Sequence, residues 1–222
     1  LGMNVVLKEG YSATAPDLSS LVTKLKRKRP DVILHTGYNP DITLFLRQAK
    51  EQGLKFKALI GHGAGYGVAD KLYDALGNDV DHVYNVDPVS IWLLDPKSLK
   101  PGLAAITKKV GDEYVKAKPG TKVKSAHVGM AASNAHVFFT DVLPRAIKKH
   151  GGIGAEALRK AALETDIPEG GTLLGFGVKF PGAGKSDMMG QNMRASPVVM
   201  QYVKRKVYVA WPKALQTIDP VL

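Results

Sequence analysis

The first ninety residues alternate between short apolar runs and segments with apolar residues at helical spacing, and this rhythm constrains the fold most strongly. We expect strands at residues 3–7, 31–36, 56–60 and 82–86, with helices that begin near Asp17, Asn39 and Val68. Strands that alternate with helices in this way form a parallel sheet with helices on both faces. Ligands of such sheets bind beyond the carboxyl ends of the strands, which are the loops around 37–39 and 61–63 here.

The rhythm changes after Asp87-Pro88 and Asp95-Pro96, where the chain is expected to cross into a second region. Helices are expected at 103–116 and 155–163, and between them a long apolar helix from about Ser125 or Ser133 to Lys149, bent by Pro144. The carboxyl-terminal part indicates β structure, with expected strands at 173–180, 197–203 and 206–211.

The composition excludes several classes of protein. Of the 222 residues 45% are hydrophobic, enough for a buried core, and no apolar run approaches the ~20 residues of a membrane span. The formal net charge is +11, but apart from a cluster at 24–29 the basic residues are scattered, so we expect a solvated basic surface and no nucleic-acid partner. The absence of cysteine excludes disulfides and thiolate sites.

The sequence holds no catalytic or metal-binding motif. The loop 61–67 is rich in glycine, but Tyr66 and Val68 stand where a dinucleotide fingerprint needs glycine, so we expect its backbone to approach a ligand or a neighbouring strand closely. The histidines form no metal-ligand pair at helical spacing, and no nucleophile elbow is present. We therefore expect no metal, no cofactor and no enzyme, with an α/β enzyme of unrecognised site as the less favoured alternative.

Motifs along nearly the whole chain resemble those of a known family. The segments are Leu18-x-x-Leu21, 30–33, 37–41 and 46–55, then 146–152, 156–163, 175–180, 190–192 and 209–212. Their order and spacing are similar to those of the branched-chain amino acid type of periplasmic solute-binding protein, which serves ABC transporters.

The resemblance implies an α/β fold of the type I periplasmic-binding-protein kind, in which two lobes joined by three crossovers close on a ligand. It assigns residues 1–88 to the main part of the second lobe, a parallel sheet flanked by helices. Residues 89–195 return to the first lobe, which is incomplete, and residues 196–222 cross back as strands. Because the first lobe's own sheet is missing, we expect an upstream part to be absent and a dimer partner to cover the apolar face left open.

The resemblance also implies partners and a location. The partners are a small-molecule ligand and the membrane permease of an ABC importer, and the location is the periplasm. A ligand-binding sensor domain on the same fold is the alternative function.

Ligand contacts follow from the same resemblance. Tyr38 matches an aromatic residue of the family's pocket, and His62 stands where the family has an acidic residue that binds the ammonium of amino-acid ligands. Because histidine can pair with an anion, we expect a small organic acid or an amino-acid-like molecule, with an aromatic carboxylate as one candidate. Further candidates for ligand contact are Asn39, Gly63, Tyr66 and Met130. Alternatively, Tyr38 packs on the start of the helix and His62 is an exposed loop residue.

Overall fold

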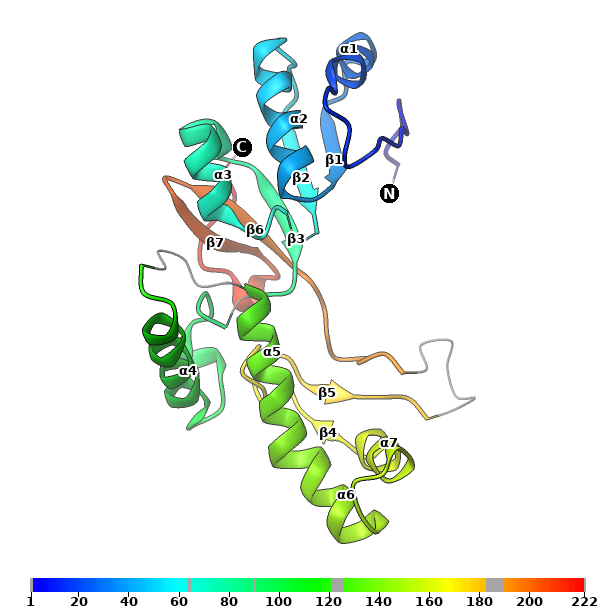
Figure 1. Ribbon diagram of the computed structural model, residues 1–222, viewed down its shortest axis with the longest axis vertical. Coiled ribbons are helices and arrows are strands. Elements are labelled where there is room, and N and C mark those ends of the chain that lie inside the picture. Colours follow the sequence, from blue (N-terminus) through cyan, green and yellow to red (C-terminus); the bar gives the residue numbers. More distant parts are fainter. Residues whose placement is uncertain (1, 64, 90, 121–125, 183–189, 222) are drawn as a thin grey trace. The chain divides into compact units, whose positions relative to one another are not determined.

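The computed structural model of the protein describes residues 2–63, 65–89, 91–120, 126–182 and 190–221 (Figure 1). The chain divides into two compact units. Unit 1 comprises Leu1–Asp87 and Val198–Leu222, and unit 2 comprises Pro88–Pro197. These breaks lie close to the boundaries that the sequence indicates, and the assignment of each unit to a lobe stays a prediction.

Unit 1 is built on a five-stranded mixed sheet with the strand order β1-β2-β3-β6-β7. The first three strands run parallel, and β6 and β7 pair antiparallel with their neighbours. The elements are α1 (Ser19–Lys28), β1 (Val32–Thr36), α2 (Asn39–Glu51), β2 (Ala58–His62), α3 (Ala69–Leu76), a 3-10 turn (Gly77–Val80), β3 (Tyr84–Asp87), β6 (Val198–Val203), β7 (Lys206–Trp211) and a second 3-10 turn (Lys213–Leu215). The predicted α/β class with parallel strands is confirmed.

The helices of unit 1 share one core with a single face of this sheet. Ile33 and His35 of β1 are buried on that face, whereas Val32 and Leu34 on the opposite face are 43% and 74% exposed. The shared core takes residues from α1, α2, α3 and four strands or their flanks, among them Val22, Phe45, Leu59, Leu72, Val83 and Tyr202. The expectation of helices on both faces is therefore corrected for the described part of unit 1.

The opposite face of the sheet is covered in part by the end of the chain. Tyr84 of β3 and Gln201 of β6, which are paired in register, both donate side-chain hydrogen bonds to the carbonyl of Val221. Leu34 lies in the same row of residues, beyond Ile60 of β2. On this face, where a helix was expected, the sheet is covered in part by irregular chain near Val221. The edge of the same face at β1 is exposed.

The expected strand at Met3 to Leu7 is not formed. Met3 and Val5 are 71% and 76% exposed, and the described partner of β1 is β2. A strand needs a neighbour to take up its backbone hydrogen bonds, and no described strand lies beside this segment. The short apolar run therefore predicted the wrong element here.

Two predicted helix starts are found with small shifts. Asp17 precedes α1 and its Oδ1 accepts the N–H of Ser19 at 3.0 Å, which satisfies one of the free amides of the first turn. The residue that precedes α2 is Tyr38 rather than Asn39, and Pro40 lies in the first turn, where its missing N–H costs nothing.

Unit 2 consists mainly of helices. Its elements are a 3-10 turn (Pro96–Ser98), α4 (Leu103–Ala117), α5 (Ala126–Val137), a π turn (Phe138–Val142), α6 (Leu143–His150), α7 (Ala155–Leu163), β4 (Asp166–Ile167) and β5 (Val178–Lys179). The strands β4 and β5 form a separate two-stranded antiparallel sheet. The helices expected at 103–116 and 155–163 are confirmed.

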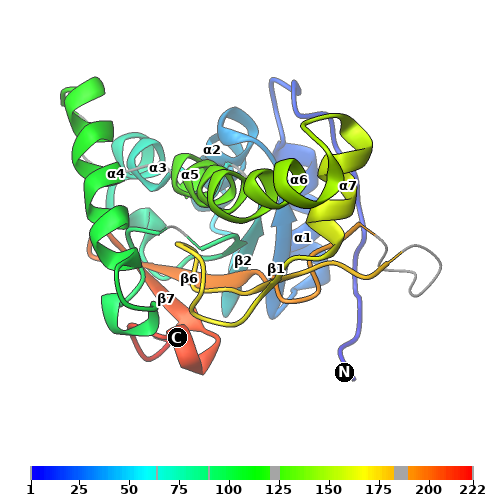
Figure 2. The same cartoon turned by 90° about the horizontal axis from the view of Figure 1, so that it is seen from below.

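The long helix of unit 2 is interrupted where Pro144 predicts a bend. Helix α5, the π turn and α6 follow one another in a single rod, and α7 packs beside α6 (Figure 2). Pro144 lies in the first turn of α6 and has no N–H for the carbonyl four residues earlier, so the turn before it widens. Ser125, one of the two expected starts, lies outside the described residues.

The expected strand at 173–180 is largely a buried turn. Only Val178–Lys179 is extended and paired, while Leu173 and Phe176 are buried. The Thr172 hydroxyl donates to the carbonyl of Phe176 at 2.7 Å, and Gly175 has a φ of 75°. These features fold the segment back on itself, so its apolar pattern reflects burial rather than a strand.

None of the described helices combines the length and the apolar character needed to cross a lipid bilayer. In the described ranges, no three His, Asp or Glu side chains are grouped as metal ligands would be.

Candidate functional site

The carboxyl ends of β1 and β2 carry the two main candidate ligand contacts. Thr36, the last residue of β1, pairs in register with His62, the last residue of β2. His62 is exposed, and Tyr38, two residues beyond β1, has 68% of its surface exposed. The parallel register thus presents an imidazole and a phenol ring from neighbouring strand ends, which is where a sheet of this kind binds ligands.

The glycine-rich loop after β2 packs against the loop after β1. A Cβ on Gly65 would lie 2.6 Å from the carbonyl carbon of Tyr38 and 2.8 Å from the amide nitrogen of Asn39. A Cβ on Gly61 would lie 2.3 Å from the ring of Tyr66. The close backbone approach expected for this loop is therefore present, and its partners are the neighbouring loop and the loop's own tyrosine.

A partly buried chain of hydrogen bonds connects these two loops. The Tyr11 hydroxyl donates to Oδ2 of Asp41 at 2.6 Å and lies 2.7 Å from Nε2 of His35. On the other side of the imidazole, Nδ1 of His35 lies 2.6 Å from the Tyr66 hydroxyl. Oδ1 of Asp41 accepts the backbone N–H of Tyr38 at 2.9 Å, so the chain ends at the loop that carries a candidate contact.

Burial sets the protonation of this cluster. It lowers the pKa of His35 to about 4, against a smaller opposing effect of the nearby Asp41 carboxylate, so the imidazole is neutral at pH 7. Burial, with the hydrogen bond to Asp41 next, raises the pKa of Tyr11 well above its usual value. The pKa of Tyr66 is likewise raised by burial. Both phenols therefore keep their protons and can act as donors.

The other candidate ligand contacts of unit 1 are less exposed to solvent than Tyr38 and His62. Tyr66 is fully buried, with its hydroxyl engaged by His35, which gives it a structural place in the core. Gly63 is half-buried and has a φ of 97°, which suits glycine. The side-chain nitrogen of Asn39 is buried and has no described hydrogen-bond partner. A ligand contact for each of the three stays a prediction, and for Tyr66 it would require the core to open.

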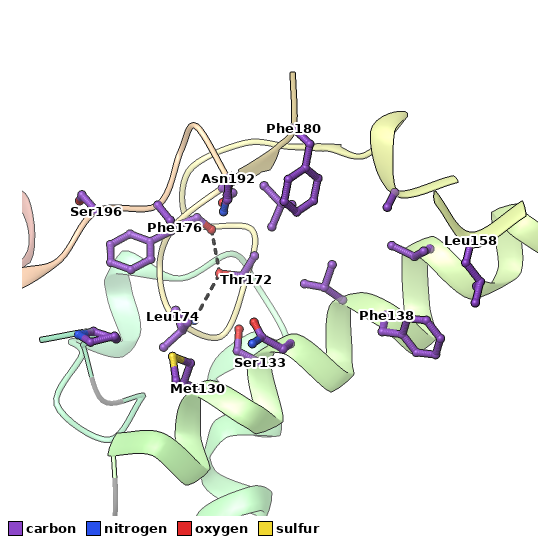
Figure 3. A pocket seen from close by; sticks show the side chains of 18 of the residues that line it. Met130, Ser133, Phe138, Leu158, Thr172, Leu174, Phe176, Phe180, Asn192 and Ser196 are labelled. Carbon is purple, nitrogen blue, oxygen red and sulfur yellow. Dashed lines mark hydrogen bonds between the residues drawn. The ribbon is translucent and has the colours of Figure 1, made fainter. Parts of the chain in front are cut away.

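Met130 belongs to unit 2, where it lines a large cavity (Figure 3). The cavity has a volume of about 980 Å³. On one side it is lined from α5, the π turn and α7, and on the other from the segments around β5. The lining side chains labelled in the figure are Met130, Ser133, Phe138, Leu158, Thr172, Leu174, Phe176, Phe180, Asn192 and Ser196.

Three of the polar side chains that line this cavity form hydrogen bonds within the protein. Thr172 is bonded to Phe176, and the Asn192 amide donates to the carbonyl of Gly177 at 2.9 Å. The Arg159 guanidinium, also at the lining, forms a two-fold hydrogen bond with Glu156. The lining thus offers mainly apolar surface, which suits hydrophobic side chains better than a zwitterion.

Sequence reasoning identified the exposed side chains but missed the partly buried cluster of Tyr11, His35 and Asp41. His35 was visible as a histidine inside an apolar strand, and Asp41 as an acidic residue in the first turn of a helix. Tyr11 lies in a segment without regular structure, and its contact with Asp41 spans 30 positions. Neither periodicity nor spacing signals such a contact.

Comparison with known proteins gives one consistent family. A family model described as periplasmic binding protein matches residues 1–197. The Leu/Ile/Val-binding protein homolog 8 of Brucella abortus is 36% identical over 213 residues, covering 96% of this chain and 48% of that protein. Homolog 7 of Brucella suis is 36% identical over 214 residues, covering 96% and 49%. The chain therefore spans about half the length of the curated relatives it matches.

Solved structures share the fold at lower identity. A leucine binding protein from Thermotoga maritima matches with a TM-score of 0.64 at 20% identity, over 90% of this chain and 49% of the other. A type 1 periplasmic binding protein from Bordetella pertussis gives 0.63 at 17% identity, over 90% and 50%. A branched-chain amino acid ABC transporter protein from Thermus thermophilus, solved with bound valine, gives 0.59 at 16% identity, over 88% and 48%. At these identities the likeness shows the fold, which is that of type I periplasmic binding proteins.

Proposed function

Because this chain belongs to the periplasmic binding protein family, we propose that it is part of a protein that binds a small solute in the periplasm and delivers it to the permease of an ABC importer. The observation that carries the proposal is the pair of exposed side chains, Tyr38 and His62, at adjacent strand ends. The names of the Brucella relatives support a role in binding rather than in catalysis.

The ligand we propose is an amino-acid-like molecule or a small organic acid whose carboxylate contacts His62. The nearby carboxylate of Asp41 is 2% exposed and both its oxygens accept hydrogen bonds from within unit 1, so it is not available to a ligand ammonium. The His62 imidazole can donate a hydrogen bond to a carboxylate, and the exposed ring of Tyr38 offers a flat apolar surface. An aromatic carboxylate would use both groups.

A thermal-shift panel tests this function. The ligands are leucine, valine, aliphatic carboxylates and aromatic carboxylates, and the proteins are this chain and a version lengthened at its amino end to the size of the Brucella relatives. A ligand at 100 times its Kd adds about 2.7 kcal/mol to the free energy of unfolding. We expect a carboxylate to raise the melting temperature of the longer protein. No shift with any compound in either protein would contradict the proposal.

The His62→Asp variant separates the ligand classes. An aspartate would repel a ligand carboxylate and would favour a ligand ammonium. We expect this variant to lose its response to simple carboxylates and to gain response to leucine or valine. Stabilisation of the wild type by leucine, lost in the variant, would keep the binding function and overturn the proposed ligand class.

We propose, further, that the cavity of unit 2 is a surface for protein packing and that, in this chain alone, a second copy covers it. The lining is apolar, and the described part of unit 2 has two strands of two residues each, too little sheet to close such a cavity from within. The additional half that the relatives possess would supply that cover in a longer protein.

A further inference from the structure

We infer that Tyr11, His35, Asp41 and Tyr66 are positioning residues that hold the loop after β1 and the loop after β2 in fixed relation to one another. The inference rests on the proposed function, because it is these loops that carry the proposed ligand contacts. In this role none of the four side chains touches the ligand, and for Tyr66 it replaces the ligand contact expected from the sequence. They act through the backbone and the neighbours of Tyr38 and His62.

The direction of every hydrogen bond in the chain follows from Tyr11. Its hydroxyl has one proton, which is donated to the nearer of two acceptors, Oδ2 of Asp41 at 2.6 Å rather than the Thr36 carbonyl at 3.3 Å, and neither of these oxygens can donate. The Tyr11 oxygen must then accept from Nε2 of His35 at 2.7 Å, so the imidazole carries its proton on Nε2. Nδ1 is consequently an acceptor, and the Tyr66 hydroxyl donates to it at 2.6 Å. The donors run in one direction, from Tyr66 through His35 and Tyr11 to Asp41.

The two ends of this chain lie in the two loops. At one end Asp41 accepts the backbone N–H of Tyr38, which fixes the residue before α2. At the other end Tyr66 lies over Gly61, within the loop that follows β2. Gly65 of that loop packs on the Tyr38 backbone. Side-chain bonds and direct backbone contact therefore join the same two segments.

Histidine is the residue suited to the middle of such a chain. In its neutral form one ring nitrogen donates and the other accepts, so it links two hydroxyls in sequence. His35 also packs against the ring of Phe45 at 4.3 Å between centroids, and this contact fixes the plane of the imidazole. A charged imidazole would have two donors, so the Tyr66 hydroxyl would have to turn its proton away and accept from Nδ1.

Amide hydrogen exchange tests the positioning role directly. Tyr11→Phe removes the central hydroxyl and leaves Oδ2 of Asp41 and Nε2 of His35 without this partner. We expect exchange of the amides of Tyr38 and of residues 63–67 to become about tenfold faster, because a hydrogen bond to a charged group is lost. The amides of β6 and β7 should be unaffected.

Tyr73→Phe is the matched control. The Tyr73 hydroxyl also donates to a carboxylate, that of Asp81 at 2.5 Å, in the same unit. The variant Tyr73→Phe therefore removes a hydrogen bond of the same kind from a tyrosine that is not part of the series from Tyr66 to Asp41. We expect it to leave amide exchange in both loops unchanged. Equal effects of the two variants, or no effect of Tyr11→Phe on either loop, would overturn the inference.

A second measurement needs no variant, so it stands even where Tyr11→Phe fails to fold. Nitrogen-15 NMR of the wild type at pH 7 reports the tautomer of His35, and we expect the proton on Nε2. A proton on Nδ1 would overturn the chain of donors.

Ligand binding is scored separately. If a ligand binds the wild type, Tyr11→Phe should weaken its Kd severalfold and Tyr73→Phe should not. If no ligand binds the wild type, the proposed function fails, while exchange and the tautomer still decide whether the loops are linked.

Discussion

At the scale of single residues, His35 should make the stability of unit 1 depend on pH. Its pKa is about 4 in the folded protein and 6.5 in an unfolded chain, because burial penalises the charged imidazole. The folded state therefore binds the proton less readily than the unfolded state. Above pH 6.5 His35 is neutral in both states and the free energy of unfolding is not reduced by it. As the pH falls from 6.5 to 4, the free energy of unfolding decreases. Below pH 4 the total loss is about 3 kcal/mol.

Urea unfolding at pH 7.5, 6, 5 and 4 measures this dependence. The groups that face the imidazole are Tyr11, Tyr66 and Asp41, and both phenols stay protonated throughout the window. His35→Gln removes the titrating group, so the difference between its pH profile and that of the wild type isolates the histidine. Parallel profiles between pH 7.5 and 5 would contradict the assigned burial of His35.

At the residue scale the sequence allowed the position of a side chain at a strand end to be predicted, because the backbone alone decides it, while contact with a ligand stays a prediction. Tyr38 and His62 follow predicted strands, and the parallel register brings such positions to one edge of a sheet. The burial of Tyr66 could not be read in the same way, because it depends on the absence of a side chain at Gly61 and on the imidazole of His35. Contacts of this kind arise only when distant segments pack.

At the scale of elements, the junction of β2 with its loop depends on Gly61. A Cβ there would lie between 2.3 and 2.6 Å from ring atoms of Tyr66, whose hydroxyl is held by His35, so the ring cannot simply move aside. We expect Gly61→Ala to lower the free energy of unfolding by about 2 kcal/mol through overpacking. The measurement is urea unfolding followed by circular dichroism.

Gly10→Ala serves as its control. A Cβ on Gly10 meets no atom within 4 Å, and we expect a change within about 0.5 kcal/mol. A neutral Gly61→Ala would show that Tyr66 can leave its place, and it would return Tyr66 to the set of open ligand contacts.

Elements were predicted correctly where hydrophobic periodicity coincided with a local signal. The start of α1 near Asp17 and the interruption of the long helix just before Pro144 have such signals, and both are found. The two segments wrongly predicted as strands, 3–7 and most of 173–180, are apolar but lack the conditions that a strand needs. One lacks a described neighbouring strand, and the other contains the turn at Gly175. Pairing partners and turns outweigh the pattern in such cases.

At the scale of the whole molecule, the two units differ in how completely they close around a core. Unit 1 has a five-stranded sheet with fully buried residues such as Val22, Phe45 and Leu59. Unit 2 also has buried residues, such as Ile91 and Leu173, but beside the small cluster between α6 and α7 it leaves a mainly apolar cavity open. Length and composition predicted neither the cavity nor its position, since both depend on which helix faces meet a partner.

This imbalance predicts self-association of the chain taken alone. The apolar surface that lines this cavity would be stabilised by burial against another apolar surface. We expect sedimentation velocity to show a dimer at micromolar concentration, and the dye 8-anilinonaphthalene-1-sulfonate to bind the chain as it dissociates on dilution. A version lengthened at its amino end to the size of the Brucella relatives should be monomeric and should not bind the dye.

A matched pair of substitutions locates the surface. Phe180 lines the cavity, whereas Phe139 is 62% exposed and is not among the lining residues. Phe180→Asp places a charge on the apolar surface and should abolish the dimer, while Phe139→Asp adds the same charge elsewhere and should leave it intact. Dimers that survive Phe180→Asp would place the association on another face. A wild-type chain that stays monomeric and binds no dye would mean that the cavity closes without a partner, and the packing role proposed for it would then be wrong.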